Sequence, residues 1–180
     1  MSTVQLHEAR ERRRRRAACA ERLLARAPEA APSLDWDALD HAPPWLGVPE
    51  PMLTAFQRRV GAVLCAPALR LWIDGPRLAA ARAALGDPFL HALLAAPDFP
   101  DLHAATAAPP RLDAAERIGA LLQAAGGGVL LASLPDGPLR SAAGAAMAPA
   151  VPLLMGAELA QALVARTMKL IAQSEMERAA

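Results

Sequence analysis

Three consecutive glycines at 126–128 form the first pattern that could support chemistry, because glycine-rich loops bind phosphate groups through their backbone amides. A loop of this kind also needs a lysine and a serine or threonine directly after the glycines, to reach phosphate and magnesium. Here the apolar residues Val129, Leu130 and Leu131 follow instead. We therefore expect the glycines to break or hinge a helix, and we predict no nucleotide or other cofactor.

A second cluster contains residue types that bind metals. Asp98, Asp101 and His103 lie close together in the sequence, and His91 precedes them by one predicted helix. A protein metal site needs three or four converging ligands. The intervening prolines spread this segment, and the chain has no H-x-x-x-H or C-x-x-C spacing. We interpret the segment as a solvated loop and expect no bound metal.

The candidate nucleophiles lack the partners that would activate them. Ser133 and Ser141 do not lie in a G-x-S-x-G elbow, and Cys65 has no evident histidine partner. The two cysteines have no paired spacing, and we interpret them as free thiols in a reducing cytoplasm. We predict that the protein is not an enzyme and has no small-molecule substrate. A small helical enzyme of unrecognised type is the remaining alternative.

The strongest charge feature of the chain is a run of five consecutive arginines: Arg12, Arg13, Arg14, Arg15 and Arg16. Arginine binds phosphate and carboxylate groups through paired hydrogen bonds. The run could therefore bind an acidic protein partner, nucleic acid or anionic lipid. It could also stay solvated, or fold back on the acidic stretch at 35–40. Nucleic acid is the less expected partner, because the rest of the chain is close to neutral and no aromatic residue interrupts the run.

Five further residues are candidates for partner binding. Trp36, Trp45 and Leu46 lie in or beside proline-rich connections. They either pin these connections to the core or act as partner anchors, because tryptophan is enriched at interface hot spots. Arg59 and Arg70 fall near apolar neighbours on a helical wheel. These two arginines are either half-buried beside an aspartate or belong to a partner interface.

The elements that must position these residues are predicted to be helical. Alanine and leucine favour helices and dominate the composition, while residues that favour strands are few. Apolar residues recur at helical spacing over 51–66 and 153–176. Gly-Pro and Gly-Asp-Pro stops separate shorter helices between these two. We predict an all-α fold, a compact multi-helix domain of short helices with Pro- and Gly-rich connections.

The domain organisation follows from a change in composition near residue 30. Residues 1–30 carry eight arginines against four glutamates, and they predict an Arg-rich N-terminal arm or helix, ordered or disordered. Residues 31–180 predict a single helical domain, with an irregular proline-rich connection at 97–111. The uncharged stretches at 118–135 and 141–157 lack the dense Leu, Ile and Val of a membrane span, so we expect them to form buried helices.

One part of the chain, residues 56–96, resembles the central helical motif of the SctK/YscK-type accessory proteins of bacterial type III secretion systems. The matching elements are an R-x-G-like turn, an A-x-R-like element and a leucine-rich helix ending in Leu-Gly: residues 59–61, 68–70 and 78–86. The Pro-Pro-Trp-Leu segment at 43–46 and the final helix at 153–172 are also similar. The arginine run departs from the family pattern.

This resemblance implies a non-catalytic cytoplasmic adaptor of the injectisome, which serves protein transport in virulence at the cytoplasmic face of the inner membrane. It implies protein–protein interaction with the SctQ-type pod protein of the sorting platform and with the cytoplasmic domain of the SctD-type inner-membrane ring protein. The stator and the ATPase would be reached indirectly. The resemblance implies no catalysis and no cofactor, and it carries over no residue-level contacts. The alternative is a basic-armed protein that binds nucleic acid or an anionic surface.

Overall fold

The computed structural model confirms the all-α prediction, since the residues it describes form helices and no strand. The described residues are 3–34, 36–40, 42–72, 74–97, 112, 114–147 and 150–179. The chain divides into two compact units, and each is discontinuous in sequence: residues 1–53 with 134–148, and residues 54–133 with 149–180. This division does not coincide with the predicted boundary at residue 30. The arginine-rich segment instead shares a unit with residues from the second half of the chain.

Two long helices and a set of shorter ones make up the units. The first unit contains α1 (Thr3–Arg26), η1 (Pro28–Ser33), α2 (Trp36–Asp40), η2 (Pro44–Gly47) and α9 (Pro138–Ala146), where η marks a 3₁₀ helix. The second contains α4 (Ala66–Arg70), α5 (Gly75–Leu85), α6 (Asp87–Ala95), η3 (Ala115–Arg117), α8 (Ile118–Ala132) and α10 (Ala157–Ala179). The sequence boundary at 53–54 falls within α3 (Glu50–Leu64). At 24 and 23 residues, α1 and α10 are the longest helices of the described part of the chain, and α10 overlaps the helical pattern predicted at 153–176.

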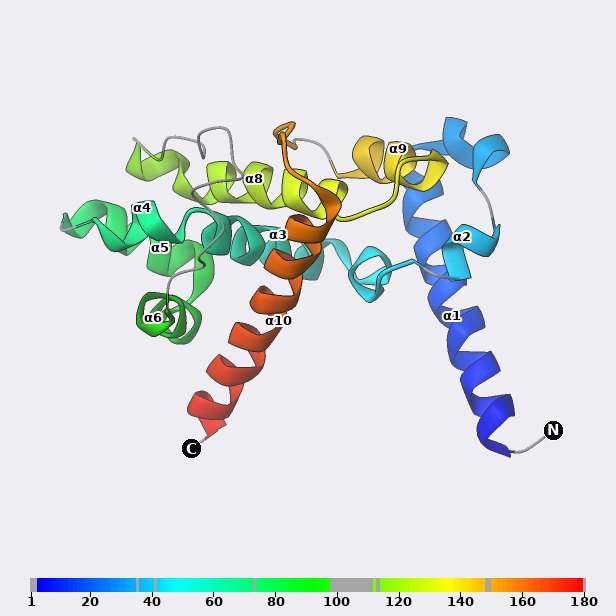
Figure 1. The fold of residues 1–180 in the computed structure, drawn as a ribbon, viewed down its shortest axis with the longest axis horizontal. Coiled ribbons are helices and arrows are strands. Elements are labelled where there is room, and N and C mark those ends of the chain that lie inside the picture. The colour runs from blue at the N-terminus through cyan, green and yellow to red at the C-terminus, as the bar shows by residue number, and fades with distance from the viewer. Residues whose placement is uncertain are drawn as a thin grey trace. The chain divides into compact units, whose positions relative to one another are not determined.

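The C-terminal half of α1 forms the centre of the first unit. Cys19, Ala20, Leu23 and, just beyond the helix, Ala27 are buried, at intervals that place them on one side of a helix. The elements α2, η1, η2 and α9 pack against α1 (Figure 1). Of these elements, α2, η2 and α9 contribute buried residues of their own: Leu39, Trp45, Leu46, Leu139, Ala142 and Ala143. Most of the segment predicted as an arm or helix is therefore a helix, and one side of its second half belongs to the core.

Arg26, the last residue of α1, joins three elements of the first unit. Its guanidinium donates a hydrogen bond of 2.8 Å to the carbonyl of Ala146 and also pairs with the carboxylate of Glu50. Ala146 ends α9, where helix carbonyls need donors from outside the helix. The hydrogen bond and the charge of Arg26 lower the pKa of the Glu50 carboxyl. This contact fixes the end of α9 beside the end of α1.

Glycines in α3 and α8 let these two helices of the second unit cross with their backbones in contact. A Cβ atom on Gly126 would lie 1.8 Å from the carbonyl oxygen of Gln57, and one on Gly61 would lie 1.9 Å from the carbonyl oxygen of Leu122. Only glycine fits at such an approach. The helix break predicted at 126–128 is therefore wrong, because α8 runs through these glycines without interruption.

The other two glycines of the triplet face the segment that leads into α10. A Cβ atom on Gly127 would lie 3.2 Å from the Cβ of Ala150, and one on Gly128 would lie 2.1 Å from the carbonyl oxygen of Val151. The amide of Val151 donates to the carbonyl of Ala124 in α8 at 3.0 Å. Close packing on two sides of α8 thus explains why three small residues follow one another.

The long helix α10 packs against α6 and α8. Its buried residues recur every three or four positions: Ala160, Leu163, Thr167, Leu170 and Ser174. The two buried hydroxyls are satisfied within the helix, because Thr167 donates to the carbonyl of Leu163 and Ser174 to that of Ile171. Among the described residues, no helix is both long and apolar enough to cross a membrane.

Candidate functional site

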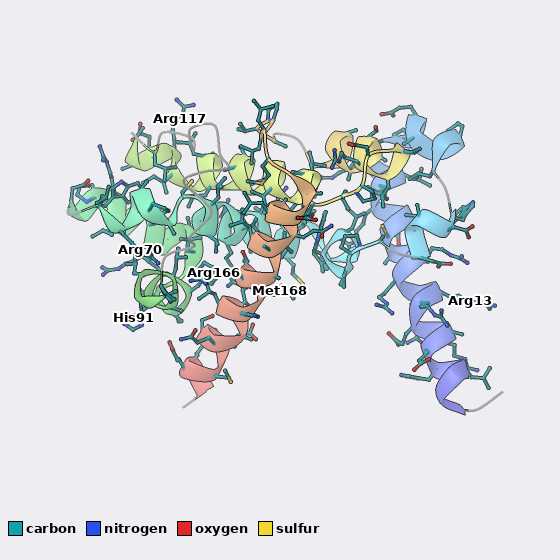
Figure 2. The ribbon with its side chains drawn as sticks, in the orientation of Figure 1. Arg13, Arg70, His91, Arg117, Arg166 and Met168 are labelled. Atoms are coloured by element: carbon teal, nitrogen blue, oxygen red, sulfur yellow. The ribbon has the colours of Figure 1, made fainter. Side chains whose placement is uncertain are left out.

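The arginine run lies on α1 just before the helix enters the core of the first unit. Its first four arginines have exposed side chains, and the fifth is half-buried. Arg12 and Arg15 are three positions apart and lie on one face of the helix. Cys19 continues that face one turn later and is buried. Arg13 projects outward from α1 (Figure 2). The run is therefore part of a folded helix.

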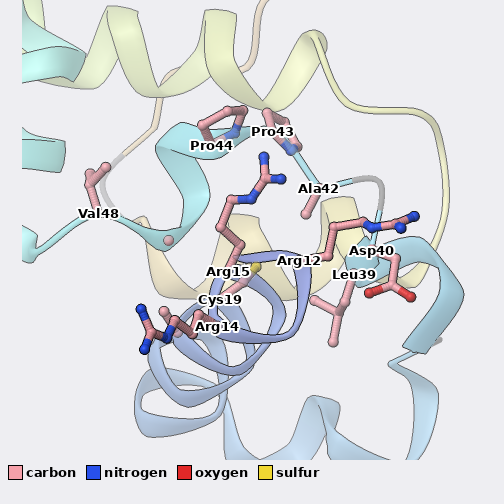
Figure 3. Close-up of a pocket in the computed structure, with 12 residues that line it drawn as sticks. Arg12, Arg14, Arg15, Cys19, Leu39, Asp40, Ala42, Pro43, Pro44 and Val48 are labelled. Carbon is pink, nitrogen blue, oxygen red and sulfur yellow. The ribbon is translucent and has the colours of Figure 1, made fainter. Parts of the chain in front are cut away.

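Arg12 and Arg15 line a hollow of about 280 Å³ between α1 and the segment that contains α2 and η2 (Figure 3). Arg15 extends towards Pro43 and Pro44, whereas Arg12 passes Ala42, with its guanidinium on the side of Asp40 in this view. Most of the remaining lining is apolar: Ala18, Cys19, Leu39, Ala42, Pro43, Pro44 and Val48. A third arginine, Arg14, also lines the hollow but pairs with Glu11. Guanidinium groups beside apolar walls suit a ligand with both anionic and aliphatic parts.

Acidic residues around the run neutralise only part of its charge. Arg16 lies 3.1 Å from the carboxylate of Asp40, and Arg14 lies 3.7 Å from that of Glu11. Three arginines of the run have no ion-pair partner among the described residues: Arg12, Arg13 and Arg15. The folding back of the run on the acidic stretch is thus observed for Arg16, while Asp35 lies outside the residues described.

The three candidate anchors of the first unit have different surroundings. Trp36 opens α2 with 58% of its surface exposed, and the guanidinium of Arg16 lies 5.8 Å from its ring centroid. This distance is within the range of a cation–π contact. Trp45 and Leu46 are only 7% and 2% exposed. The structure thus places Trp45 and Leu46 in the core and leaves Trp36 exposed beside the arginine run.

The two candidate arginines of the second unit contact other helices of that unit. The guanidinium of Arg59 lies 5.4 Å from the ring centroid of Phe89. Arg70 donates to the carbonyl oxygens of Leu93 and Ala96 at the C-terminal end of α6, where helix carbonyls need external donors. Each arginine therefore has an intramolecular contact with a partner other than the aspartate expected from the sequence. Neither belongs to the unit that carries the run.

Both thiols are buried and are protonated at neutral pH. Burial raises the pKa of the Cys19 thiol to about 11, against a smaller lowering by the charge of Arg22. Burial also raises the pKa of the Cys65 thiol to about 12. The thiolate is the nucleophilic form of cysteine. Neither cysteine is therefore activated for covalent chemistry in this structure.

The structure describes the two candidate serines and only part of the candidate metal cluster. Ser133 and Ser141 each donate a hydrogen bond to a backbone carbonyl three or four residues earlier. His91 is exposed on α6. The described part of the chain holds no group of three or more His, Cys, Asp and Glu side chains that could bind a metal ion. Asp98, Asp101 and His103 lie outside the described residues.

No protein-family model, curated protein or solved structure matches this chain. The candidate site is therefore defined by the residues of the chain alone. One wall of the hollow could be found from the sequence, because Arg12, Arg15 and Cys19 follow helical spacing. The opposite wall, at 39–48, was missed, because only the tertiary packing of this segment against α1 brings it to the arginines.

Proposed function

We propose that this protein is a non-catalytic cytoplasmic adaptor of a bacterial type III secretion system, which links the inner-membrane ring to the SctQ-type pods of the sorting platform. The hollow on α1 carries the binding part of this proposal. There Arg12 and Arg15, unpaired among the described residues, stand beside apolar walls. Trp36 adds an exposed ring nearby. Arginine and tryptophan are enriched in the hot spots of protein interfaces.

The secretion-system part of the proposal rests on the resemblance of residues 56–96 to the SctK/YscK-type proteins. This stretch contains α4, α5, α6 and most of α3, which form part of the second unit. Contacts such as that of Arg59 with Phe89 join these helices to one another. Such mutual packing suits a structural role in an assembly. The partners are the SctQ-type pod protein and the cytoplasmic domain of the SctD-type ring protein, at the cytoplasmic face of the inner membrane.

The positions of the chemistry-bearing residues support binding rather than catalysis. The glycines at 126–128 pack closely against α3 and against the segment that leads into α10. Burial raises the pKa of the thiols of Cys19 and Cys65, so that both stay protonated at neutral pH. The glycines thus serve the packing of helices and the cysteines are buried, so neither is placed to bind phosphate or to attack a substrate.

The proposal is tested by purifying the tagged full-length chain from its native host with a high-salt wash and identifying the co-purified proteins by mass spectrometry. We expect the SctQ-type and SctD-type proteins to be recovered. Each should persist in a strain that lacks the other, because an adaptor binds both directly. An untagged strain supplies the background. Recovery of neither protein from a host that assembles the secretion system would overturn the proposal.

One observation favours a second candidate function, which is binding to nucleic acid or to an anionic membrane surface. Four consecutive exposed arginines at 12–15 stand on a folded helix, and such a density of positive charge attracts phosphate groups. Binding to duplex DNA or to anionic vesicles should then fall steeply between about 50 and 200 mM salt, because counterions are released on binding. Absence of binding at the lower salt concentration would exclude this function.

A further inference from the structure

The hollow of the first unit keeps positive charge that its own acidic residue does not neutralise. Asp40 is the acidic residue in the lining of the hollow, but its carboxylate is held by Arg16 at 3.1 Å. Arg12 and Arg15 line the hollow and have no ion-pair partner within the described ranges. A ligand with two anionic groups could pair with both cations through charge-assisted hydrogen bonds.

The walls beside these cations favour a ligand that also has an aliphatic part. Leu39 and Cys19 are buried, and Ala42, Pro43 and Val48 are half-buried. The two consecutive prolines at 43–44 restrict the backbone of the wall that faces α1, so little conformational freedom is lost there on binding. An aliphatic side chain placed against these residues would remove apolar surface from water, whereas a bare phosphate group would not.

We propose that the hollow binds an acidic amphipathic segment of a partner protein. Two carboxylates of the segment pair with Arg12 and Arg15, and an aliphatic side chain packs against Leu39 and Val48. This inference rests on the proposed function in one respect, namely that the partner is a protein.

Two observations favour a protein segment over a nucleic acid or a lipid surface. The volume of about 280 Å³ suits one or two aliphatic side chains, and the lining is mostly apolar. The lining also contains the carboxylate of Asp40, so the hollow is not lined by cations alone, as a site for a row of phosphates would be. Carboxylates on a helix can be spaced to avoid Asp40 while meeting the paired donors of the guanidinium groups.

The test uses the full chain and a synthetic peptide of about fifteen residues, long enough to form a helix when bound. The peptide carries glutamates on one helical face and leucines on the adjacent face. One matched peptide replaces the glutamates by glutamine, and another replaces the leucines by serine. Fluorescence anisotropy measures affinity, and amide chemical shifts locate the site at 12–19 and 39–48. We expect each matched peptide to bind at least about tenfold more weakly.

Substitutions in the chain separate the hollow from the general charge of α1. Arg12→Gln and Arg15→Gln should each weaken binding of the acidic peptide about tenfold, because each removes a charge-assisted hydrogen bond. Arg13→Gln is the matched control: it removes the same charge from the same helix but lies outside the hollow, and it should change affinity by less than about twofold. These arginines are exposed, and circular dichroism checks that the variants fold. Ala42→Glu should abolish binding, because it places a carboxylate of the chain itself in the hollow.

The outcomes distinguish this inference from its rivals. Equal losses for Arg12→Gln and Arg13→Gln would overturn it, because only overall charge would then matter. It would also be overturned if duplex DNA or anionic vesicles displaced the acidic peptide through Arg12 and Arg15. If the peptide fails to bind while platform proteins still co-purify, the adaptor function is supported and the proposed binding of an acidic segment in the hollow is overturned. Selective peptide binding without recovery of platform proteins would support the hollow and remove the secretion-system assignment.

Discussion

Replacing Gly126 by alanine adds one methyl group at the crossing of α8 and α3. The methyl carbon would lie 1.8 Å from the carbonyl oxygen of Gln57 and 2.9 Å from the amide nitrogen of Gly61. Non-bonded carbon and oxygen atoms lie at least about 3.3 Å apart even in C–H···O contacts, so the helices must separate locally by roughly 1.5 Å. Both obstructing atoms belong to the backbone, so no change of rotamer can relieve the clash.

The cost of this separation can be estimated from three effects. Overpacking a core costs about 1–3 kcal/mol. Loosening the buried side chains around the crossing, which include Val60, Leu122 and Val129, adds about 2 kcal/mol. The higher helix propensity of alanine stabilises α8 by about 1 kcal/mol and offsets part of this loss. We expect the free energy of unfolding of the second unit to fall by about 2–4 kcal/mol, a large share of the roughly 5–15 kcal/mol typical of a domain.

The assay is urea unfolding followed by circular dichroism, combined with hydrogen exchange of the α8 amides, which reports on the second unit alone. Gly119→Ala is the matched control in the same helix. Its Cβ would lie 3.6 Å from the Cβ of Ala84, an ordinary contact, so this variant should gain about 0.5–1 kcal/mol. The double variant with Gly61→Ala and Gly126→Ala should lose less free energy of unfolding than the sum of the losses of the two single variants, because either substitution already separates the helices. A Gly126→Ala protein as stable as the wild type would refute this reasoning.

Trp45→Ala should lower the free energy of unfolding by about 3–5 kcal/mol, because it empties a core position, whereas Trp36→Ala at an exposed position should change it by about 0.5 kcal/mol or less. Urea titration compares the two, and equal losses would contradict the burial of Trp45. The thiol of Cys19 should resist a thiol reagent at about pH 8 until the protein is unfolded, because it is buried and protonated. Since its pKa is raised from 9.0 to about 11, the folded state holds the proton more tightly than the unfolded state, and stability should fall as pH rises through that range. In the same pH series Cys19→Ala should show a smaller fall, and an identical fall would count against this explanation. Arg26→Gln should raise the pKa of the Glu50 carboxyl towards its ordinary value, as followed by NMR titration, and an unchanged pKa would exclude the contact.

The ends of the short helices could be predicted from the sequence, because capping is local. Asp74 accepts a hydrogen bond of 2.9 Å from the backbone N–H of Arg77 at the start of α5. Gly86, with a φ of +82°, separates α5 from α6, a conformation that glycine adopts readily. The amphipathic pattern at 51–66 also lies close to the observed helix Glu50–Leu64. These features depend on residues within one turn of one another.

Features that depend on distant contacts could not be predicted. Each glycine costs a helix about 1 kcal/mol relative to alanine, so three in a row favour a break when α8 is considered alone. The contact of Gly126 with the backbone of α3 reverses that prediction. The second wall of the hollow was missed for the same reason. Helical spacing groups Arg12 with Arg15, but it says nothing about which other segment faces them.

The discontinuity of the first unit has a consequence for its synthesis. The helix α1 ends at Arg26, while α9, which packs against it, begins at Pro138. At roughly 5–20 residues per second, a ribosome needs about 5–20 s to make the intervening chain. During that interval α1 lacks its contacts with α9, and the apolar surface that these contacts cover is open to chaperones or aggregation. In truncated chains that stop before residue 138, the surface of α1 that α9 contacts stays uncovered. We therefore expect a stable fragment with the arginine run to include α9 as well.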